Sequence, residues 1–222
     1  MKQIPGGVCA AKGFSAAGLR AGIKPTSPAD KNDLGLIVSS VPCAAAGVFT
    51  TNRVKAAPVW LDKEQLANGT AQVVIANSSI ANACAPEGEE TCRREMALVS
   101  EALDVDASDV LVSSTGVIGV RLNVEAIEAA LPELVSKLEA SEAGSDAVAR
   151  AIMTTDTVKK EISYEFQLSV LQEATSPSSA KTAISSSFRT SPFSRARAFS
   201  CRSTKSFPQT KSQTSSSIPT LK

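Results

Sequence analysis

Histidine is absent from all 222 residues of the chain. This absence excludes the Ser-His-Asp and Cys-His nucleophile systems, and it removes the commonest metal-binding side chain. Any nucleophilic chemistry in such a protein must use another base, such as a lysine or a free N-terminal amine.

The chain also lacks long apolar runs and paired cysteines. No run of eighteen apolar residues occurs, so we expect no membrane span. The opening "MKQIPGGVCAAKG" resembles neither a secretory signal nor a transit peptide, so we expect a soluble, cytoplasmic protein. The cysteines are odd in number, and no two of them form a C-x-x-C pair, which argues against a disulfide framework and against a metal site. We interpret them as buried or idle thiols: Cys9, Cys43, Cys84, Cys92 and Cys201.

Glycine and acidic residues are nearly missing from the end of the chain. Residues 166–222 contain no glycine, eight basic residues and one acidic residue, giving a net charge of +7. Residues 1–165 contain 15 basic and 21 acidic residues, giving −6. The second part is rich in serine and has no hydrophobic periodicity, as is typical of disordered, low-complexity segments. We therefore predict a folded part over residues 1–165 and a separate tail over 166–222.

Within residues 1–165, several short apolar runs bounded by small polar residues predict strands. "DLGLIVSS" (33–40) and "GVFTTN" (47–52) flank "VPCAAA", which indicates a hairpin. "AQVVIANSS" (71–79) and "DVLVSST" (109–115) predict buried strands whose ends open onto a site.

Helical spacing appears between and after these runs. Residues 89–105 place apolar side chains on one face of a helix that joins two strands. Asn123 is expected to cap the next helix, and Pro132 is expected to begin a separate helix after it. A further helix is predicted over 145–153, ending at "TTDT". The alternation of strands and helices predicts a mixed α/β domain.

The stretch "VLVSSTGVIGV" (110–120) has two interpretations. Serine, threonine and glycine form ordinary turns for local reasons. A strand that opens into a tight polar turn is also a way to direct N–H groups at a developing negative charge. The residues alone do not decide between a turn and an oxyanion site.

Four stretches together resemble one family. They are "GFSAAGLRAGIK" (13–24), "AAGVFTTNRVKAAPV" (45–59), "SSTGVIGV" (113–120) and "AIMTTDTVKKE" (151–161). In this order they are similar to the N-terminal portion of the ornithine acetyltransferases, the bifunctional glutamate N-acetyltransferases of arginine biosynthesis. The resemblance covers about residues 3–168.

The resemblance implies a self-processing acetyltransferase with a mixed α/β layered fold. Such a precursor cuts itself before an internal threonine, whose freed amine serves as the base for its own hydroxyl. This threonine carries acetyl from N-acetylornithine to glutamate; some members also accept acetyl-coenzyme A, and no cofactor is expected. The partner implied is the C-terminal β chain of the same precursor, in a hetero-oligomer. By this resemblance, Thr115 and Gly116 form the oxyanion hole.

The resemblance also bears on two polar stretches. In "TTDT", Thr154 or Thr155 matches a threonine that contacts the amino-acid substrate, although either residue can equally bond the backbone locally. Asp156 is interpreted as structural. In "NSSIAN" (77–82), the two asparagines are interpreted as partners for buried backbone groups. Ser79 stands where the family usually has glycine, and a positive φ angle at this position would cost serine about 1 kcal/mol.

The sequence departs from the family after Leu168. The family's Lys-Gly-Ser-Gly segment and its Ala-Thr cleavage motif are not found, and we interpret the Ala174–Thr175 pair as coincidence. We therefore expect no nucleophile in these 222 residues and no activity from them alone. A shifted reading frame is our hypothesis for the tail, and a truncation or a misjoined gene model would give a similar sequence.

Two other functions remain open. One is a related self-processing amidase or aminopeptidase. The other is a binding module whose basic tail contacts nucleic acid, through phosphate neutralisation and stacking on Phe188, Phe193, Phe199 and Phe207. The tail lacks any ordered nucleic-acid motif, so we do not expect this partner.

Overall fold

The computed structural model describes residues 1–166. These residues form a mixed α/β domain, as the sequence predicts, and the tail prediction for 166–222 falls almost entirely outside the described part. The strands are β1 (Lys2–Ile4), β2 (Phe14–Leu19), β3 (Leu34–Ala44), β4 (Thr70–Asn77), β5 (Val110–Ser114) and β6 (Ser163–Glu165). The α-helices are α1 (Ala57–Gln65), α2 (Gly88–Leu103), α3 (Val124–Ser136) and α4 (Glu142–Ala151).

The main sheet of the described residues has the strand order β2-β3-β4-β5. β2, β3 and β4 pair in antiparallel fashion, whereas β5 lies parallel to β4 because α2 carries the chain back between them. The register places Leu34 opposite Leu19 and opposite Asn77, and Asn77 opposite Ser114. The ends of β2, β4 and β5 therefore meet the start of β3 at one edge, which we call the site edge.

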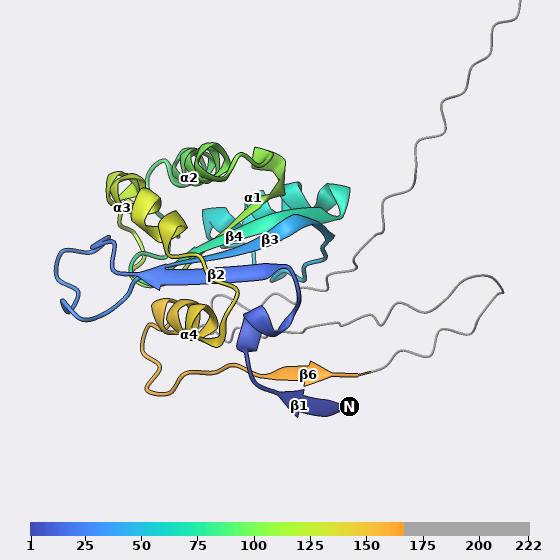
Figure 1. Cartoon of the computed structure of the whole chain (residues 1–222). Coiled ribbons are helices and arrows are strands. Elements are labelled where there is room, and N and C mark those ends of the chain that lie inside the picture. The colour runs from blue at the N-terminus through green and yellow to red at the C-terminus, as the bar shows by residue number, and fades with distance from the viewer. Residues whose placement is uncertain (167–222) are drawn as a thin grey trace, which may run out of the picture.

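Helices cover both faces of this sheet. α1, α2 and α3 lie over one face, and α4 lies over the other, against β2 and β3 (Figure 1). The larger apolar core, which includes Leu36, Ile75 and Ile127, fills the space under the first three helices. A smaller core beneath α4 contains Ala16, Ile37 and Val148. The fold is thus layered, with helices on both sides of a mixed sheet.

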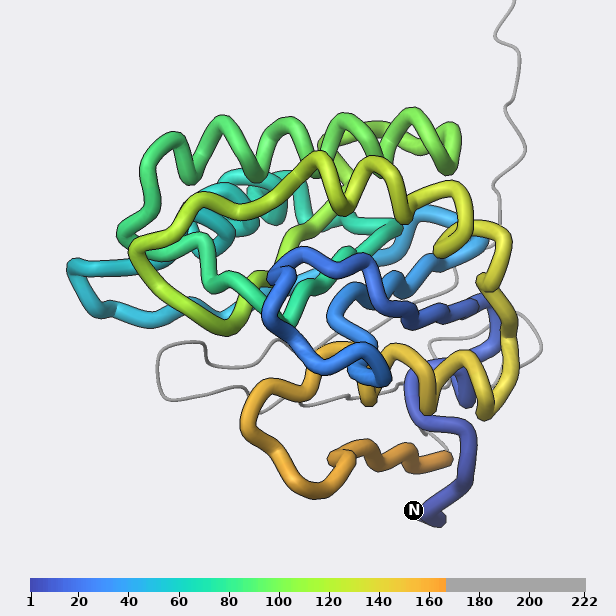
Figure 2. Tube along the Cα trace, turned by 90° about the vertical axis from the view of Figure 1, so that its left-hand side faces the viewer, coloured from blue at the N-terminus to red at the C-terminus, as the bar shows by residue number. Residues whose placement is uncertain are grey.

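The two ends of the described chain lie side by side (Figure 2). β1 pairs antiparallel with β6, with Gln3 opposite Tyr164. The Ser163 hydroxyl donates to the Gly7 carbonyl at 2.7 Å, and Ser145 accepts from the Val8 N–H at 2.9 Å. These contacts fasten the N-terminal segment to α4 and β6.

The hairpin prediction for residues 33–52 is wrong. β3 continues through the expected turn to Ala44, with a bulge between Val38 and Cys43, and Gly47–Asn52 contains no strand. Cys43 pairs with Ala71 of β4. Pairing with β4, which lies far along the chain, therefore overrides the local preference of "VPCAAA" for a turn.

The prediction of a helix break at Pro132 is also wrong. α3 runs unbroken through Pro132, whose side chain faces solvent, while Leu131 and Leu134 on either side are buried. Apolar packing holds the helix despite the missing N–H. The predicted cap is confirmed, since the Asn123 side chain accepts from the Ala126 N–H at 3.1 Å.

The helix predicted from Ser145 begins earlier, at Glu142. Its N-cap is Ser141, whose hydroxyl accepts from the Gly144 N–H at 3.1 Å. The helix joining β4 and β5 is confirmed as α2. Its buried face contains Met96 and Val99, as expected, and also Glu95, which the sequence pattern does not indicate.

Candidate active site

The polar turn after β5 lies at the site edge of the sheet. Thr115 is buried, and its N–H donates to the Asn77 carbonyl at 3.0 Å. Its hydroxyl lies 3.5 Å from the same carbonyl oxygen, at the outer limit of a hydrogen bond. The hydroxyl is therefore held weakly and can turn toward another acceptor.

Gly116 occupies a position that other residues cannot fill. Its φ is +131°, and an added Cβ would lie 2.2 Å from the Ser79 carbonyl oxygen. The turn therefore requires glycine both for its backbone conformation and for its close approach to the neighbouring loop.

Within residues 1–166, the Gly116 N–H is a free donor between two occupied ones. The N–H of Thr115 bonds Asn77, and the N–H of Val117 donates to the Ser79 carbonyl at 3.1 Å. Gly116 is exposed, and its N–H makes no hydrogen bond within residues 1–166. A free N–H beside a weakly held hydroxyl is the kind of donor pair that an oxyanion requires.

The Asn77 side chain forms hydrogen bonds with both loops at the site edge. Its side-chain oxygen accepts from the N–H groups of Ser79 and Ile80, at 3.1 and 3.0 Å. Its amide nitrogen donates to the Ser114 hydroxyl at 3.0 Å. The prediction that this asparagine serves buried polar groups is confirmed.

Asn82 is the second asparagine of the same stretch. Its side chain donates to the Gly88 carbonyl at 2.9 Å and to the Cys92 sulfur at 3.0 Å. Asn82 has a positive φ of 48°, as do Cys84 and Glu87 nearby. Its side chain thus joins this strained loop to the start of α2.

The strain anticipated at Ser79 is not found, since its φ is not positive. The Ser79 hydroxyl instead donates to Asp33 at 3.1 Å. Asp33 is fully buried and accepts from the N–H groups of Ala21, Gly22 and Ile23, at 2.6, 3.3 and 3.0 Å. Asp33 is not among the residues expected from the sequence, because its partners lie between 10 and 46 residues away along the chain.

The threonines of "TTDT" follow α4, on the other face of the sheet from α2 and α3. Thr154 is half-buried, and its carbonyl accepts from Lys31 at 3.3 Å, close to where β3 begins at the site edge. Thr155 is exposed. Within residues 1–166, no hydrogen bond joins either residue to Thr115 or Gly116. Their contact with substrate stays a prediction.

Asp156 is ion-paired with Lys160. The hydrogen bond from Lys160 lowers the pKa of Asp156 below its ordinary value. An ionised, paired carboxylate agrees with the structural interpretation of this residue.

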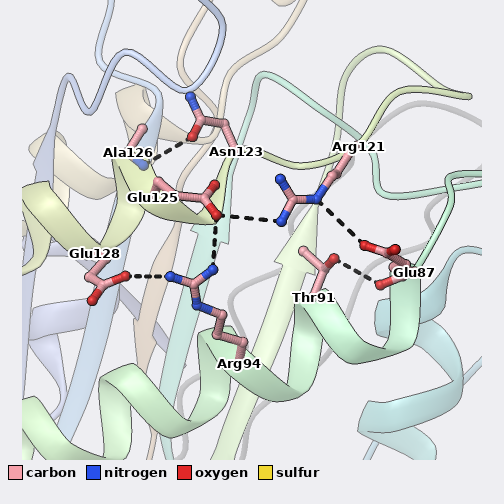
Figure 3. Close-up of polar contacts among 8 residues, drawn as sticks. All are labelled: Glu87, Thr91, Arg94, Arg121, Asn123, Glu125, Ala126 and Glu128. Carbon is pink, nitrogen blue, oxygen red and sulfur yellow. Dashed lines mark hydrogen bonds and ion pairs between the residues drawn. The ribbon is translucent and has the colours of Figure 1, made fainter.

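A network of charged side chains fixes the far end of the loop that follows Gly116 (Figure 3). Arg121 lies 3.8 Å from Glu87, at the start of α2, and 3.4 Å from Glu125, at the start of α3. Arg94 binds the same Glu125 at 2.9 Å and Glu128 at 2.6 Å. These side chains are about half exposed, so each pair contributes little stability, and the network mainly orients the loop against the two helices.

The described residues offer no group of three metal-ligating side chains. No helix among them is long and apolar enough to cross a membrane. The four cysteines of residues 1–166 form no disulfide with one another, and burial raises the pKa of the Cys92 thiol. The site edge itself presents hydroxyl and backbone N–H groups as hydrogen-bond donors.

The fold and this edge define a mixed α/β protein that presents hydroxyl and backbone donors at the end of a parallel strand. The chain matches the ArgJ family over residues 15–183 and belongs to that family.

Among similar proteins is the arginine biosynthesis bifunctional protein ArgJ of Thermosynechococcus vestitus, 48% identical over 166 residues. This alignment covers 74% of the present chain and 38% of the relative. A glutamate N-acetyltransferase of Methanothermobacter thermautotrophicus is 44% identical over 175 residues, covering 78% of this chain and 41% of that one. The chain thus spans about two fifths of the length of these curated relatives.

A solved structure with the same fold is the ornithine acetyltransferase of Mycobacterium tuberculosis, complexed with ornithine. It has a TM-score of 0.66 and 41% sequence identity, over 71% of this chain and 84% of that chain. The ArgJ protein of Bacillus halodurans gives a TM-score of 0.66 at 39% identity, over 71% of this chain and 81% of that chain. The mixed α/β fold is therefore shared with ArgJ structures.

Proposed function

We propose that residues 1–166 are the N-terminal part of an acetyltransferase that moves acetyl from N-acetylornithine to glutamate. The observation that carries the proposal is the Gly116 N–H, which is free within residues 1–166, beside the weakly held Thr115 hydroxyl. Membership of the ArgJ family supports acetyl transfer as the reaction that uses these donors.

Thr115 and Gly116 act on the tetrahedral intermediate. A nucleophilic hydroxyl attacks the acetyl carbonyl of N-acetylornithine, and the carbonyl oxygen becomes an anion that accepts from both donors. Collapse of the intermediate expels the ornithine amine, which takes up the proton, and leaves acetyl on the nucleophile. The glutamate amine then attacks this ester, and the acetyl group passes from the nucleophile to glutamate by the same steps in reverse order. Fixed donors that await the developing charge lower both barriers.

The nucleophile lies outside these residues. We propose an N-terminal threonine, freed by self-cleavage of a longer precursor, whose amine accepts the hydroxyl proton. This suits a chain without histidine. Thr154 or Thr155 contacts the amino-acid substrate, and acetyl-coenzyme A is a possible second acetyl donor.

The partner is the C-terminal β chain of the same precursor, in a cytoplasmic hetero-oligomer. The apolar side chains beside the turn support this, since Val117, Ile118 and Val120 are between 40% and 65% exposed. Covering them with a second chain would bury apolar surface and exclude water from the oxyanion donors. By themselves, the 222 residues are expected to be inactive.

A chimera tests the proposal. Residues 1–166 are joined to the C-terminal remainder of the Methanothermobacter relative, and N-acetylglutamate is measured from N-acetylornithine and glutamate. We expect the chimera to transfer acetyl and the 222-residue chain alone to give no product. A folded, self-cleaved chimera that hydrolyses N-acetylornithine without acetylating glutamate would instead support the amidase interpretation.

A further inference from the structure

Two acidic side chains are buried between α1, α2 and β5, away from the residues assigned to catalysis. Asp62 of α1 and Glu95 of α2 both have 0% exposure. A carboxylate removed from water is strongly unfavourable unless hydrogen bonds or an opposite charge compensate it. This pair therefore requires a physical explanation.

The Asp62 side chain contacts the side of β5 that faces away from β4. Within residues 1–166, β5 is the last strand of the main sheet. The Asp62 Oδ1 accepts from the Val112 N–H at 2.9 Å. Alternate N–H groups of a parallel strand face opposite sides. Since the Thr115 N–H bonds Asn77 of β4, the Val112 N–H faces away from β4. Asp62 thus supplies the acceptor that a further strand would otherwise provide.

Glu95 has no such partner. Neither of its carboxyl oxygens takes part in a hydrogen bond within residues 1–166. Burial, and then the charge of Asp62, raises the pKa of Glu95 to about 8. At neutral pH it therefore keeps its proton, and a protonated carboxyl is itself a donor.

Within residues 1–166, no positive charge acts on Glu95, because its pKa responds to burial and to Asp62. β5 contains no titratable side chain, and the thiol of Cys92 on α2 is kept neutral by burial. On α1, Lys63 and Glu64 are exposed. The carboxylates of α3 and of the turn before β5 have other partners: Glu125 and Glu128 bind Arg94, Glu133 binds Lys137, Asp106 caps Ser108, and Asp109 accepts from Thr70. Asp62 is the charged group that acts on the pKa of Glu95, and its carboxylate can accept a hydrogen bond from a protonated carboxyl.

We propose that Glu95 donates its carboxyl proton to Asp62 and thereby holds the Asp62 carboxylate against the edge of β5. The protonated pair positions β5, which ends at Ser114, directly before Thr115 and Gly116. When hydroxide removes the proton, two carboxylates share one buried site, they repel, and the hydrogen bond to Val112 weakens. The effect on β5 is independent of acetyl transfer; only its consequence for the oxyanion donors rests on the proposed function.

Amide hydrogen exchange in the full 222-residue chain, followed by NMR between pH 6 and pH 9, tests the pair. Protection of Val112 is compared with that of Ile75 in β4, so that the intrinsic pH dependence of exchange cancels. We expect Val112 to lose at least tenfold in relative protection, with a midpoint near the Glu95 pKa. Glu95→Gln, which keeps a neutral donor, should hold the ratio constant, whereas Glu101→Gln at an exposed site of α2 should behave as the parent.

A ratio that stays constant across the pH range in the parent, or that falls equally in Glu95→Gln, would overturn the proposal. If Glu95→Gln does not fold, the glutamate carboxyl groups of the parent chain are labelled with ¹³C and titrated by NMR. This titration then decides whether Glu95 is protonated at neutral pH. A glutamate resonance that titrates near pH 8 in step with Val112 exchange supports the pair, and carboxyls that all titrate in the ordinary acidic range refute it. Neither measurement requires acetyl transfer, so failure of the proposed function would leave the outcome of this test unchanged.

Discussion

Gly116 and Gly119 lie in one loop, but the structure favours glycine at the two positions for different reasons. Both have positive φ angles, +131° and +74°, but only Gly116 lacks room for a Cβ, since nothing lies within 4 Å of the corresponding position at Gly119. The backbone conformation alone disfavours a side chain at both sites, and steric overlap with the Ser79 carbonyl is added at Gly116.

Gly116→Ala should therefore destabilise the chain by more than Gly119→Ala. We expect about 1 kcal/mol for Gly119→Ala and on the order of 3 kcal/mol for Gly116→Ala, because a backbone atom must move in the second case. Chemical denaturation of the two variants and the parent measures the difference. Equal losses would mean that the close approach to Ser79 does not constrain the turn.

Asp33 is the residue on which the loops of the site edge converge. Its carboxylate binds three successive N–H groups after β2 and the Ser79 hydroxyl after β4. Asp33→Ala should lower the free energy of unfolding by about 2 to 4 kcal/mol, because buried donors lose their acceptor. Asp30→Ala, at an exposed site in the same loop, should stay within about 0.5 kcal/mol of the parent. Thermal unfolding compares them, and similar losses at both sites would contradict this role.

At the scale of the element, α3 tolerates an internal proline. Pro132 provides no N–H for the carbonyl of Glu128, one turn earlier, and its ring is exposed. The buried stripe formed by Ile127, Leu131 and Leu134 keeps the helix continuous. The helix is therefore held by its packing against α2 and the sheet rather than by local preference.

Pro132→Ala should stabilise the chain, by up to about 3 kcal/mol, because it restores the hydrogen bond and the helix propensity at an exposed site. Urea denaturation gives the change, and Glu133→Ala at the adjacent exposed position serves as the control. A Pro132→Ala chain that is less stable than the parent would show that the proline ring supports a bend that the packing of α3 requires.

At the scale of the whole molecule, Glu95 makes stability depend on pH. Its pKa is about 8 in the folded state against 4.5 for an ordinary glutamate. Below pH 4.5 the group is protonated in both states, and its stabilising contribution is complete. Between pH 4.5 and 8 the unfolded chain releases the proton while the folded chain keeps it. The free energy of unfolding should therefore fall by up to about 1.4 kcal/mol per pH unit.

Denaturation of the parent and of Glu95→Gln at several pH values between 5 and 8 measures this contribution. Glu95→Gln should remove the downward slope, and Glu101→Gln should retain it. A parent and a Glu95→Gln variant with parallel pH profiles would show that Glu95 ionises normally despite its burial.

The sequence predicts those features of the fold that depend on local pattern. The apolar run of β5 followed by Thr115 and Gly116 indicates a strand that opens into a polar turn, and the cap at Asn123 follows from neighbouring residues. The pairing of Cys43 with β4, the bonds of Asp33 and the burial of Glu95 depend on segments 10 to 50 residues away or on packing between helices. No local pattern contains that information, so the hairpin was wrongly expected and both acidic residues were missed.

The acetyl-transfer rate of the chimera with Thr115→Ala measures the oxyanion role of this turn, with Thr157→Ala as a matched control at an exposed threonine. Thr115→Ala should lower kcat by roughly a hundredfold or more with little change in KM, since an oxyanion donor acts on the transition state. Thr157→Ala should leave kcat unchanged. A Thr115→Ala chimera that folds, cleaves itself and turns over at the parent rate would contradict the oxyanion role of this turn.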